Sequence, residues 1–165
     1  MAEHSSQPFL ASDSSLQDGR QSERALAIAR GTCRLLRSFG FAPLAELSLS
    51  SGHRADLVAL GQKGEIWIVE IKSSLEDFRA DNKWHHYNEH CDRLFFAVNE
   101  EFPREMLPSD AGFILADQYG AAILREAPED KLSAPRRKQV HLAFARAAAL
   151  KLHGLSDPGA GLPPR

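Results

Sequence analysis

Two carboxylates and a lysine interrupt strongly apolar stretches of the chain: Asp56, and further on Glu70 and Lys72. Apolar residues surround them, and burying such charged groups is costly unless an opposite charge pairs with them. Carboxylate oxygens are the ligands that hard divalent cations prefer, and an ammonium group beside them can bind a phosphate. The three residues together therefore indicate a site for Mg²⁺ or Mn²⁺ and a phosphodiester, and hence phosphodiester chemistry.

Each of these residues has an expected role. Asp56 and Glu70 are predicted to bind the metal, with the main-chain carbonyl of Ile71 completing the inner shell. Lys72 shares a strand face with Glu70, where it could orient the attacking water or stabilise the developing negative charge. Glu46 is the third predicted acid, because a symmetric hairpin would place position 46 opposite position 56. It would bind the metal directly or through water, and the four charged residues form the predicted catalytic set.

Two alternatives remain open. Glu23, near the start of the first predicted helix, is another candidate for the third acid. It lies nearly opposite the apolar stripe of that helix, at about 100° per residue, so we predict that it is solvated and prefer Glu46. A Glu-x-Lys triplet by itself is as well explained by a salt bridge at a strand end. The placement of the whole set on successive strands, followed by a crossover helix, favours a site.

Hydrophobic periodicity and turn residues predict how these positions are held. Helices are expected at 21–39, from a cap at Ser74 to about 89, and at 135–152, with Gly154 as the stop. Strands are expected at 44–49, 54–60, 66–72, 94–98, 112–116 and 121–125. The first three strands form a meander, the fourth joins in parallel through the crossover helix, and the last two form a hairpin. The predicted fold class is therefore α/β with a mixed sheet.

This αβββαβ order, with Asp56 followed by Glu70-x-Lys72, resembles the PD-(D/E)XK nuclease superfamily. Ala55 stands where the superfamily name has proline, a position that carries no chemistry. The chain is more closely similar to the MmcB-like DNA repair family, over about residues 25–153. The segments that carry this similarity are 46–60, 64–74, 77–87, 91–98, 117–125 and the basic cluster 136–138. The resemblance implies a restriction-endonuclease-like core followed by a C-terminal β-hairpin and helix, and a role in DNA repair.

The resemblance also implies DNA as a partner, and polar residues near the acids are its predicted contacts. Arg54 shares a strand face with Asp56, where it could bind a phosphate or neutralise the carboxylate. Lys83 and Tyr87, four apart on the crossover helix, resemble an accessory nuclease motif, although a surface lysine beside a core tyrosine explains them equally well. A basic cluster at the start of the last helix suits an external anion, because the helix dipole disfavours cations there. The predicted DNA-binding residues are Arg54, Ser73, Lys83, Tyr87, Arg136, Arg137 and Lys138.

Length and composition agree with one globular domain. The chain has 165 residues, 43% of them hydrophobic, and a formal net charge of −2, so any nucleic-acid surface must be a local patch. We expect a disordered arm at 1–19, a nuclease-like domain at 20–153 and a disordered tail at 154–165. No apolar run is long enough to suggest a membrane span, and two cysteines make no disulfide framework, so we expect a cytoplasmic protein.

Three function classes follow from these observations. The first is a Mg²⁺- or Mn²⁺-dependent endonuclease that hydrolyses DNA in repair. The second is a catalytically inactive, DNA-binding repair accessory, since the superfamily also contains inactive members. The third is a protein-interaction adaptor that binds neither metal nor DNA. Other repair proteins and a second copy of the chain are further candidate partners, and no membrane partner is expected.

Overall fold

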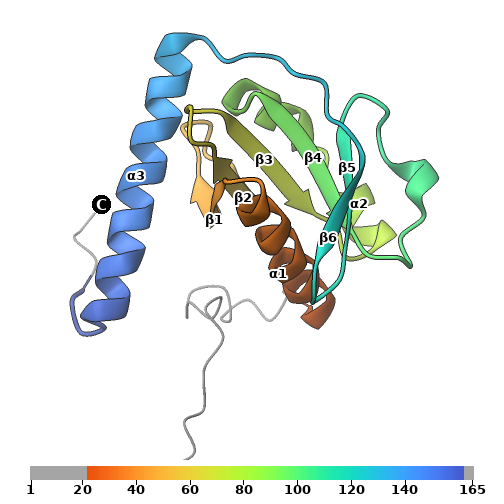
Figure 1. The fold of residues 1–165 in the computed structure, drawn as a ribbon, viewed down its shortest axis with the longest axis horizontal. Helices are drawn as coiled ribbons and strands as arrows, with labels where there is room; N and C mark the ends of the chain where they lie inside the picture. Colours follow the sequence, from red (N-terminus) through yellow and green to blue (C-terminus); the bar gives the residue numbers. More distant parts are fainter. Residues whose placement is uncertain (1–21, 162–165) are drawn as a thin grey trace, which may run out of the picture.

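Six strands form one mixed sheet in residues 22–161, the part of the chain that the computed structural model describes (Figure 1). They are β1 Ala42–Ser48, β2 Arg54–Leu60, β3 Ile66–Ile71, β4 Arg93–Val98, β5 Gly112–Ala116 and β6 Ala121–Arg125. The strands lie side by side in chain order. Pairing is antiparallel from β1 to β3, parallel from β3 to β5, and antiparallel between β5 and β6. The predicted arm 1–19 and the end of the predicted tail lie outside the described residues.

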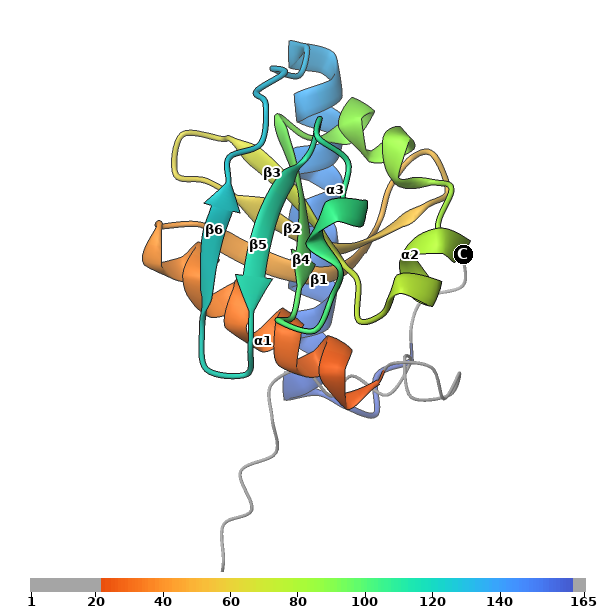
Figure 2. The same cartoon turned by 90° about the vertical axis from the view of Figure 1, so that its right-hand side faces the viewer.

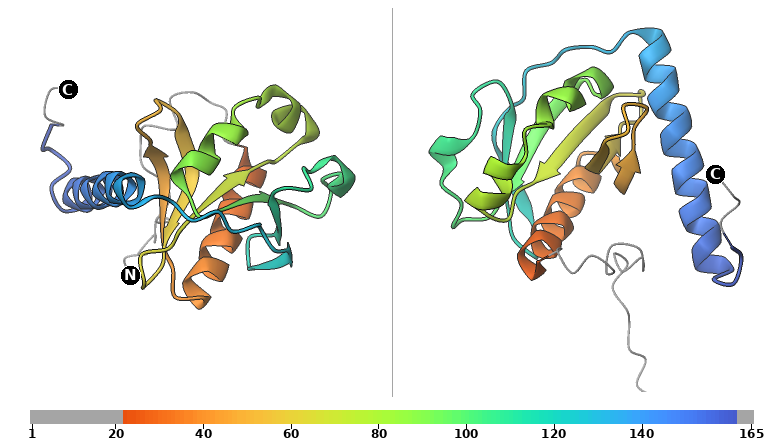
Figure 3. Two further views of the ribbon diagram at one scale, coloured as in Figure 1. Left: turned by 90° about the horizontal axis from the view of Figure 1, so that it is seen from above. Right: turned by 180° about the vertical axis from the view of Figure 1, so that it is seen from behind.

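Helices cover both faces and one edge of this sheet (Figures 1 and 2). They are α1 Glu23–Ser38, α2 Leu75–Ala80, the 3-10 helices η2 Trp84–His90 and η3 Arg104–Met106, and α3 Ala134–Ser156. Seen from above in Figure 3, α1 lies on one side of the sheet and α2 with η2 on the other, while α3 stands beside β1. Within the described part of the chain, no helix is long and apolar enough to cross a membrane.

The sheet separates two hydrophobic clusters because successive strand residues point to opposite faces. On one face, Ile28 and Leu36 of α1 pack against a layer that includes Val69. On the other face, Trp84 and Tyr87 of η2 belong to the cluster beneath the crossover. Since β3 is buried on both faces, a charged residue at its end lies in a dry environment.

The arrangement confirms the predicted α/β fold with a restriction-endonuclease-like αβββαβ core and a C-terminal hairpin and helix. The hairpin register is also as predicted, since Ala45 pairs with Leu57 and Leu47 with Ala55, which leaves positions 46 and 56 facing each other. The prediction that Ser74 caps the crossover helix is confirmed by its side chain, which accepts a hydrogen bond from the Asp77 amide at 3.1 Å.

Two predicted helices have different bounds in the structure. The prediction of a single crossover helix that reaches residue 89 is wrong, because α2 ends at Ala80 and a separate 3-10 helix begins at Trp84. Asp81 explains the break: its carboxylate accepts the Lys83 amide at 2.9 Å, and such local bonds compete with helical ones. The last helix runs through Gly154 to Ser156, past the predicted stop, since a glycine costs a helix only about 1 kcal/mol.

A buried acid–base pair fixes α3 to the sheet. Asp92 is 4% exposed, and its carboxylate accepts the amides of Ile66 at 2.8 Å and Leu132 at 2.9 Å. Arg137 donates to both of its oxygens, at 2.8 and 2.6 Å, and also to the carbonyl of Gly64 at 2.9 Å. Burial alone would raise the pKa of Asp92, but the bonds from Arg137 and the two amides lower it below its ordinary value. The first residue of β3 and the beginning of α3 are therefore joined through one carboxylate.

This pair predicts a stability loss with a defined pH dependence. Asp92→Asn should lower the free energy of unfolding by about 3 kcal/mol near neutral pH, because Arg137 loses its partner. A depressed carboxyl pKa contributes stability above the ordinary pKa that is lost as the pH falls. The difference from wild type should therefore shrink below about pH 4. Urea unfolding at several pH values measures it, with Asp130→Asn, an exposed neighbour, as the control. Equal losses from both variants at neutral pH would contradict the assignment.

Candidate active site

The two predicted metal ligands lie where β2 and β3 separate. Backbone pairing between these strands stops at Leu57 and Val69. Beyond that point side chains replace the ladder: the Asp56 carboxylate accepts the Ile71 amide at 2.8 Å, and the Glu70 carboxylate accepts the Asp56 amide at 3.1 Å. Each acid is thus held by a backbone amide on the opposite strand. The structure brings Asp56 and Glu70 together, as the sequence predicts.

This pair carries negative charge into the protein interior. Glu70 is only 3% exposed, and burial raises the pKa of its carboxyl well above the ordinary value, with the neighbouring charge of Asp56 adding to the effect. Burial also raises the pKa of Asp56, although the amide of Ile71 and the charge of Lys72 act in the opposite direction. Two adjacent carboxylates, one buried and one partly buried, are costly to ionise, and a bound divalent cation would remove that cost.

Lys72 closes the site from the end of β3. Its side chain is buried, with Nζ 2.6 Å from Oδ2 of Asp81 and 4.0 Å from Oε2 of Glu70. Burial would lower the pKa of the ammonium group, but the Asp81 hydrogen bond and the nearby carboxylates raise it above the ordinary value. Lys72 is therefore a fixed cation beside the two acids at neutral pH.

Asp81 is the member of this cluster that the sequence analysis missed. The expected continuous helix placed it on a regular helical turn, with no reason to face β3. Its sequence context does hold a signal, because Asp81 and Asn82 are both poor helix formers that favour turns. A break at this point turns the aspartate toward Lys72.

Position 46 of β1 lies opposite position 56 of β2, but the Glu46 side chain lies beside Arg54. Its backbone has a φ of 58°, the left-handed region, which interrupts the alternation of β1. Its carboxylate lies 3.9 Å from the guanidinium of Arg54. It also opposes the effect of burial on Lys151: burial lowers the pKa of that ammonium group, and the Glu46 charge offsets part of the shift. The expected convergence of three acids is therefore not what the structure shows. The alternative acid, Glu23, is exposed in the first turn of α1.

The donor set fits a hard divalent cation with two carboxylates rather than three. Among residues 22–161, no group of three or more His, Cys, Asp or Glu side chains is arranged to hold a metal ion. Mg²⁺ commonly binds through one or two carboxylates and keeps several water ligands. Asp56, Glu70 and the carbonyl of Ile71 are accordingly the groups that could hold such an ion.

The predicted DNA contacts nearest the acids fall into exposed and buried groups. Arg54 is exposed, whereas Tyr87 is buried and donates its hydroxyl to the Arg54 carbonyl at 2.9 Å. Burial and the charges of Glu70 and Asp56 raise the pKa of Tyr87. The break after α2 leaves Lys83 exposed and separates it from the helical partnership with Tyr87 that the sequence suggested. The amide of Ser73 donates to Asp77 at 3.4 Å, beside the start of α2.

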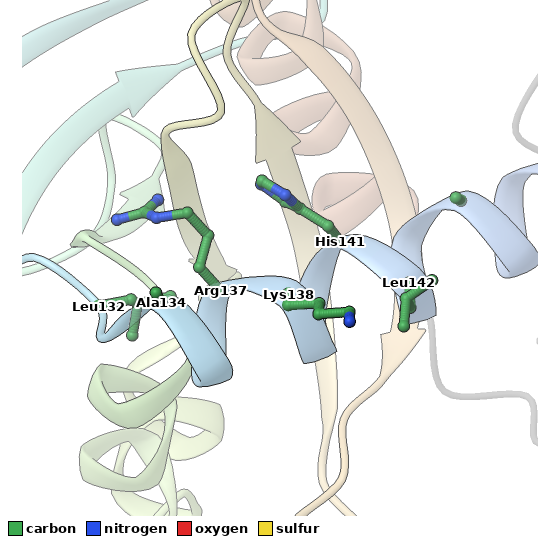
Figure 4. Close-up of a pocket in the computed structure, with 7 residues that line it drawn as sticks. Leu132, Ala134, Arg137, Lys138, His141 and Leu142 are labelled. Atoms are coloured by element: carbon green, nitrogen blue, oxygen red, sulfur yellow. The ribbon is translucent and has the colours of Figure 1, made fainter.

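The basic cluster at the start of α3 is divided in the same way. The guanidinium of Arg137 is occupied by Asp92 and the carbonyl of Gly64, so it anchors the helix. Arg136 is partly exposed and Lys138 is exposed. In Figure 4, Arg137 and His141 point toward the turn between β2 and β3, while Lys138 and Leu142 point away from it. The groove drawn there lies along α3 and does not include the acids.

Fold and site together define an α/β domain of restriction-endonuclease-like architecture with an acidic pair beside a buried lysine. The model of the family described as "DNA repair protein MmcB-like" matches residues 12–159, so the chain belongs to the MmcB-like DNA repair family. A protein of unknown function from Silicibacter pomeroyi has a similar solved structure. It is 48% identical, with a TM-score of 0.82, and the match covers 86% of this chain and 97% of that one. No curated protein matches the chain. The family supports a role in DNA repair.

The raised pKa of Glu70 predicts that removing its charge stabilises the metal-free protein. When the pKa of a carboxyl is higher in the folded than in the unfolded state, the folded protein loses stability as the pH rises above the ordinary pKa of the group, about 4.3 for glutamate. In EDTA at neutral pH, Glu70→Gln should therefore raise Tm by about 2–4 °C, the shift that about 1 kcal/mol gives in a domain of this size. The glutamine oxygen can still accept the Asp56 amide.

Differential scanning calorimetry at neutral pH and at about pH 4 makes this comparison, because the glutamate is largely protonated at the lower value. Glu76→Gln on the exposed side of α2 is the matched control and should leave Tm unchanged. A Glu70→Gln protein no more stable than wild type at neutral pH would show that the carboxylate is not under electrostatic strain.

Proposed function

We propose that this protein is a metal-dependent endonuclease that hydrolyses DNA phosphodiester bonds during repair. The observation that carries the proposal is the pair formed by the partly buried Asp56 and the buried Glu70, each hydrogen-bonded to a backbone amide of the adjacent strand, with the Lys72 ammonium 4.0 Å from Glu70. A purely structural salt bridge would need one acid for one base. Here two carboxylates remain close together with raised pKa values, a state that a divalent cation stabilises.

The residues of this chain would divide the work as follows. Asp56, Glu70 and the carbonyl of Ile71 hold Mg²⁺ or Mn²⁺, which when bound polarises phosphate oxygens and lowers the pKa of water. Asp81 and the nearby carboxylates raise the pKa of Lys72, so it stays protonated at neutral pH and supplies a fixed positive charge beside the acids. Both of its predicted roles, orienting the water and stabilising the developing charge, are compatible with a protonated ammonium group.

Exposed and partly exposed cations supply candidate phosphate contacts. Arg54 is the first residue of β2, two positions before Asp56, Lys83 directly precedes η2, and Arg136 and Lys138 lie at the start of α3. Since the net charge of the chain is −2, DNA binding would depend on this local patch and weaken steeply with salt. Arg137 is left out of the proposed contacts because Asp92 occupies it.

A repair accessory that binds DNA and another protein without cutting is the second candidate, and one observation favours it. Large apolar side chains are exposed on α3, namely Leu142, Leu150, Leu152 and Leu155. Exposed apolar side chains gathered on one helix suit contact with another protein. An accessory of this kind would not need the acidic pair, so activity separates the two candidates.

Cleavage assays with Mg²⁺ and with Mn²⁺ on single-stranded, duplex, nicked and branched DNA test the proposal. Wild type should cut at least one of these substrates. Asp56→Asn, Glu70→Gln and Lys72→Met should each reduce the rate by at least about 100-fold, the range found when a charge-stabilising group is removed from an active site. Each substitution is close in volume to the residue it replaces, so loss of activity reports on charge.

Glu76→Gln, which removes an exposed carboxylate from the same region, is the matched control and should retain full activity. Cleavage that survives all three site substitutions would contradict the proposed site. An absence of cleavage together with salt-sensitive DNA binding would contradict the enzyme and support the accessory. If the protein neither cut nor bound DNA, a protein-interaction adaptor would be the remaining candidate.

A further inference from the structure

The closest charged partner of Lys72 is neither of the predicted metal ligands. Its Nζ lies 2.6 Å from Oδ2 of Asp81 and 4.0 Å from Oε2 of Glu70. The first distance is that of a strong charge-assisted hydrogen bond, whereas the second is too long for a hydrogen bond. The hydrogen bond to Asp81 therefore fixes the position of the Lys72 ammonium group.

Asp81 is itself held in place. Its second oxygen, Oδ1, accepts the backbone amide of Lys83 at 2.9 Å, so the two carboxylate oxygens serve different partners. Its side chain is 16% exposed, and that of Lys72 is 6% exposed, so the pair is largely shielded from water. A shielded pair with both partners fixed is far better defined than a surface salt bridge.

The segment between β3 and β4 is not one continuous helix, and its interruption allows the contact between Asp81 and Lys72. A continuous helix would satisfy more backbone groups than a six-residue helix followed by a 3-10 helix. The chain instead ends α2 at Ala80, takes an extended conformation at Asp81, and resumes at Trp84. The interruption brings the Asp81 carboxylate to the end of β3, where it lies 2.6 Å from the Lys72 ammonium.

We propose that Asp81 is a positioning residue that fixes the Lys72 ammonium beside Glu70. Without its charge, the flexible lysine side chain would lose its strongest bond and sample other rotamers, because a neutral acceptor holds an ammonium group about half as strongly. The consequence for catalysis rests on the proposed nuclease function, whereas the consequence for the mobility of Lys72 does not.

Two variants test this. Asp81→Asn keeps an oxygen for the Lys83 amide and removes the charge, and Asp81→Ser keeps a turn-forming acceptor that is too short to reach Lys72. Carbon-13 relaxation of the lysine Cε groups measures mobility directly, with the Lys72 signal assigned from Lys72→Met. The Lys72 order parameter should be high in wild type and fall below about 0.6 in both variants. Glu76→Gln should leave it unchanged.

Kinetics on the same proteins supplies the second readout. If wild type cuts DNA, both Asp81 variants should lower kcat by about tenfold while KM stays within about twofold, since the cation is misplaced but DNA contacts remain. A rigid Lys72 in both variants, or unchanged kcat in an active enzyme, would overturn the proposal. If wild type does not cut any substrate, the order parameters alone decide about Asp81, and only the proposed nuclease function fails.

Discussion

The opening between β2 and β3 is the feature on which the site depends. Two side chains, those of Asp56 and Glu70, accept the amides that the backbone ladder would otherwise satisfy. This exchange costs the sheet little hydrogen bonding, but it fixes two carboxylates close together, one of them buried and the other partly buried. Their mutual repulsion is offset in part by Lys72, and a divalent cation would offset the remainder.

Two acid–base pairs hold the two ends of β3 and thereby support this opening. At the start of the strand, Asp92 accepts the amide of Ile66 and binds Arg137 of α3. At the other end, Lys72 is bound to Asp81 from the crossover. Both aspartates come from the segment that joins β3 to β4. The segment between β3 and β4 therefore has two roles: it connects two parallel strands, and it places one aspartate at each end of β3.

Much of this could be predicted from the sequence, because the relevant signals are local. Alternating apolar residues and turn residues gave the strand order and the β1–β2 register, and register placed position 46 opposite position 56. The orientation of the Glu46 side chain could not be predicted. Its backbone adopts the left-handed region, which glycine or asparagine usually signals in a sequence and glutamate does not. Asp81 was missed because its role depends on a tertiary contact with Lys72 that interrupts a helix. The family resemblance supplied the role in DNA repair, which no spacing of residues could.

The central claim is that the acidic pair Asp56 and Glu70 is a cation site, and a Mn²⁺ titration of the metal-free protein, followed by electron paramagnetic resonance, tests it most directly. The account predicts that wild type binds Mn²⁺ at one site per chain, that Mg²⁺ competes for it, and that Asp56→Asn abolishes it. Mn²⁺ suits the test because it takes the same oxygen ligands as Mg²⁺. Failure of wild type to bind, or binding that persists unchanged in Asp56→Asn, would contradict the account.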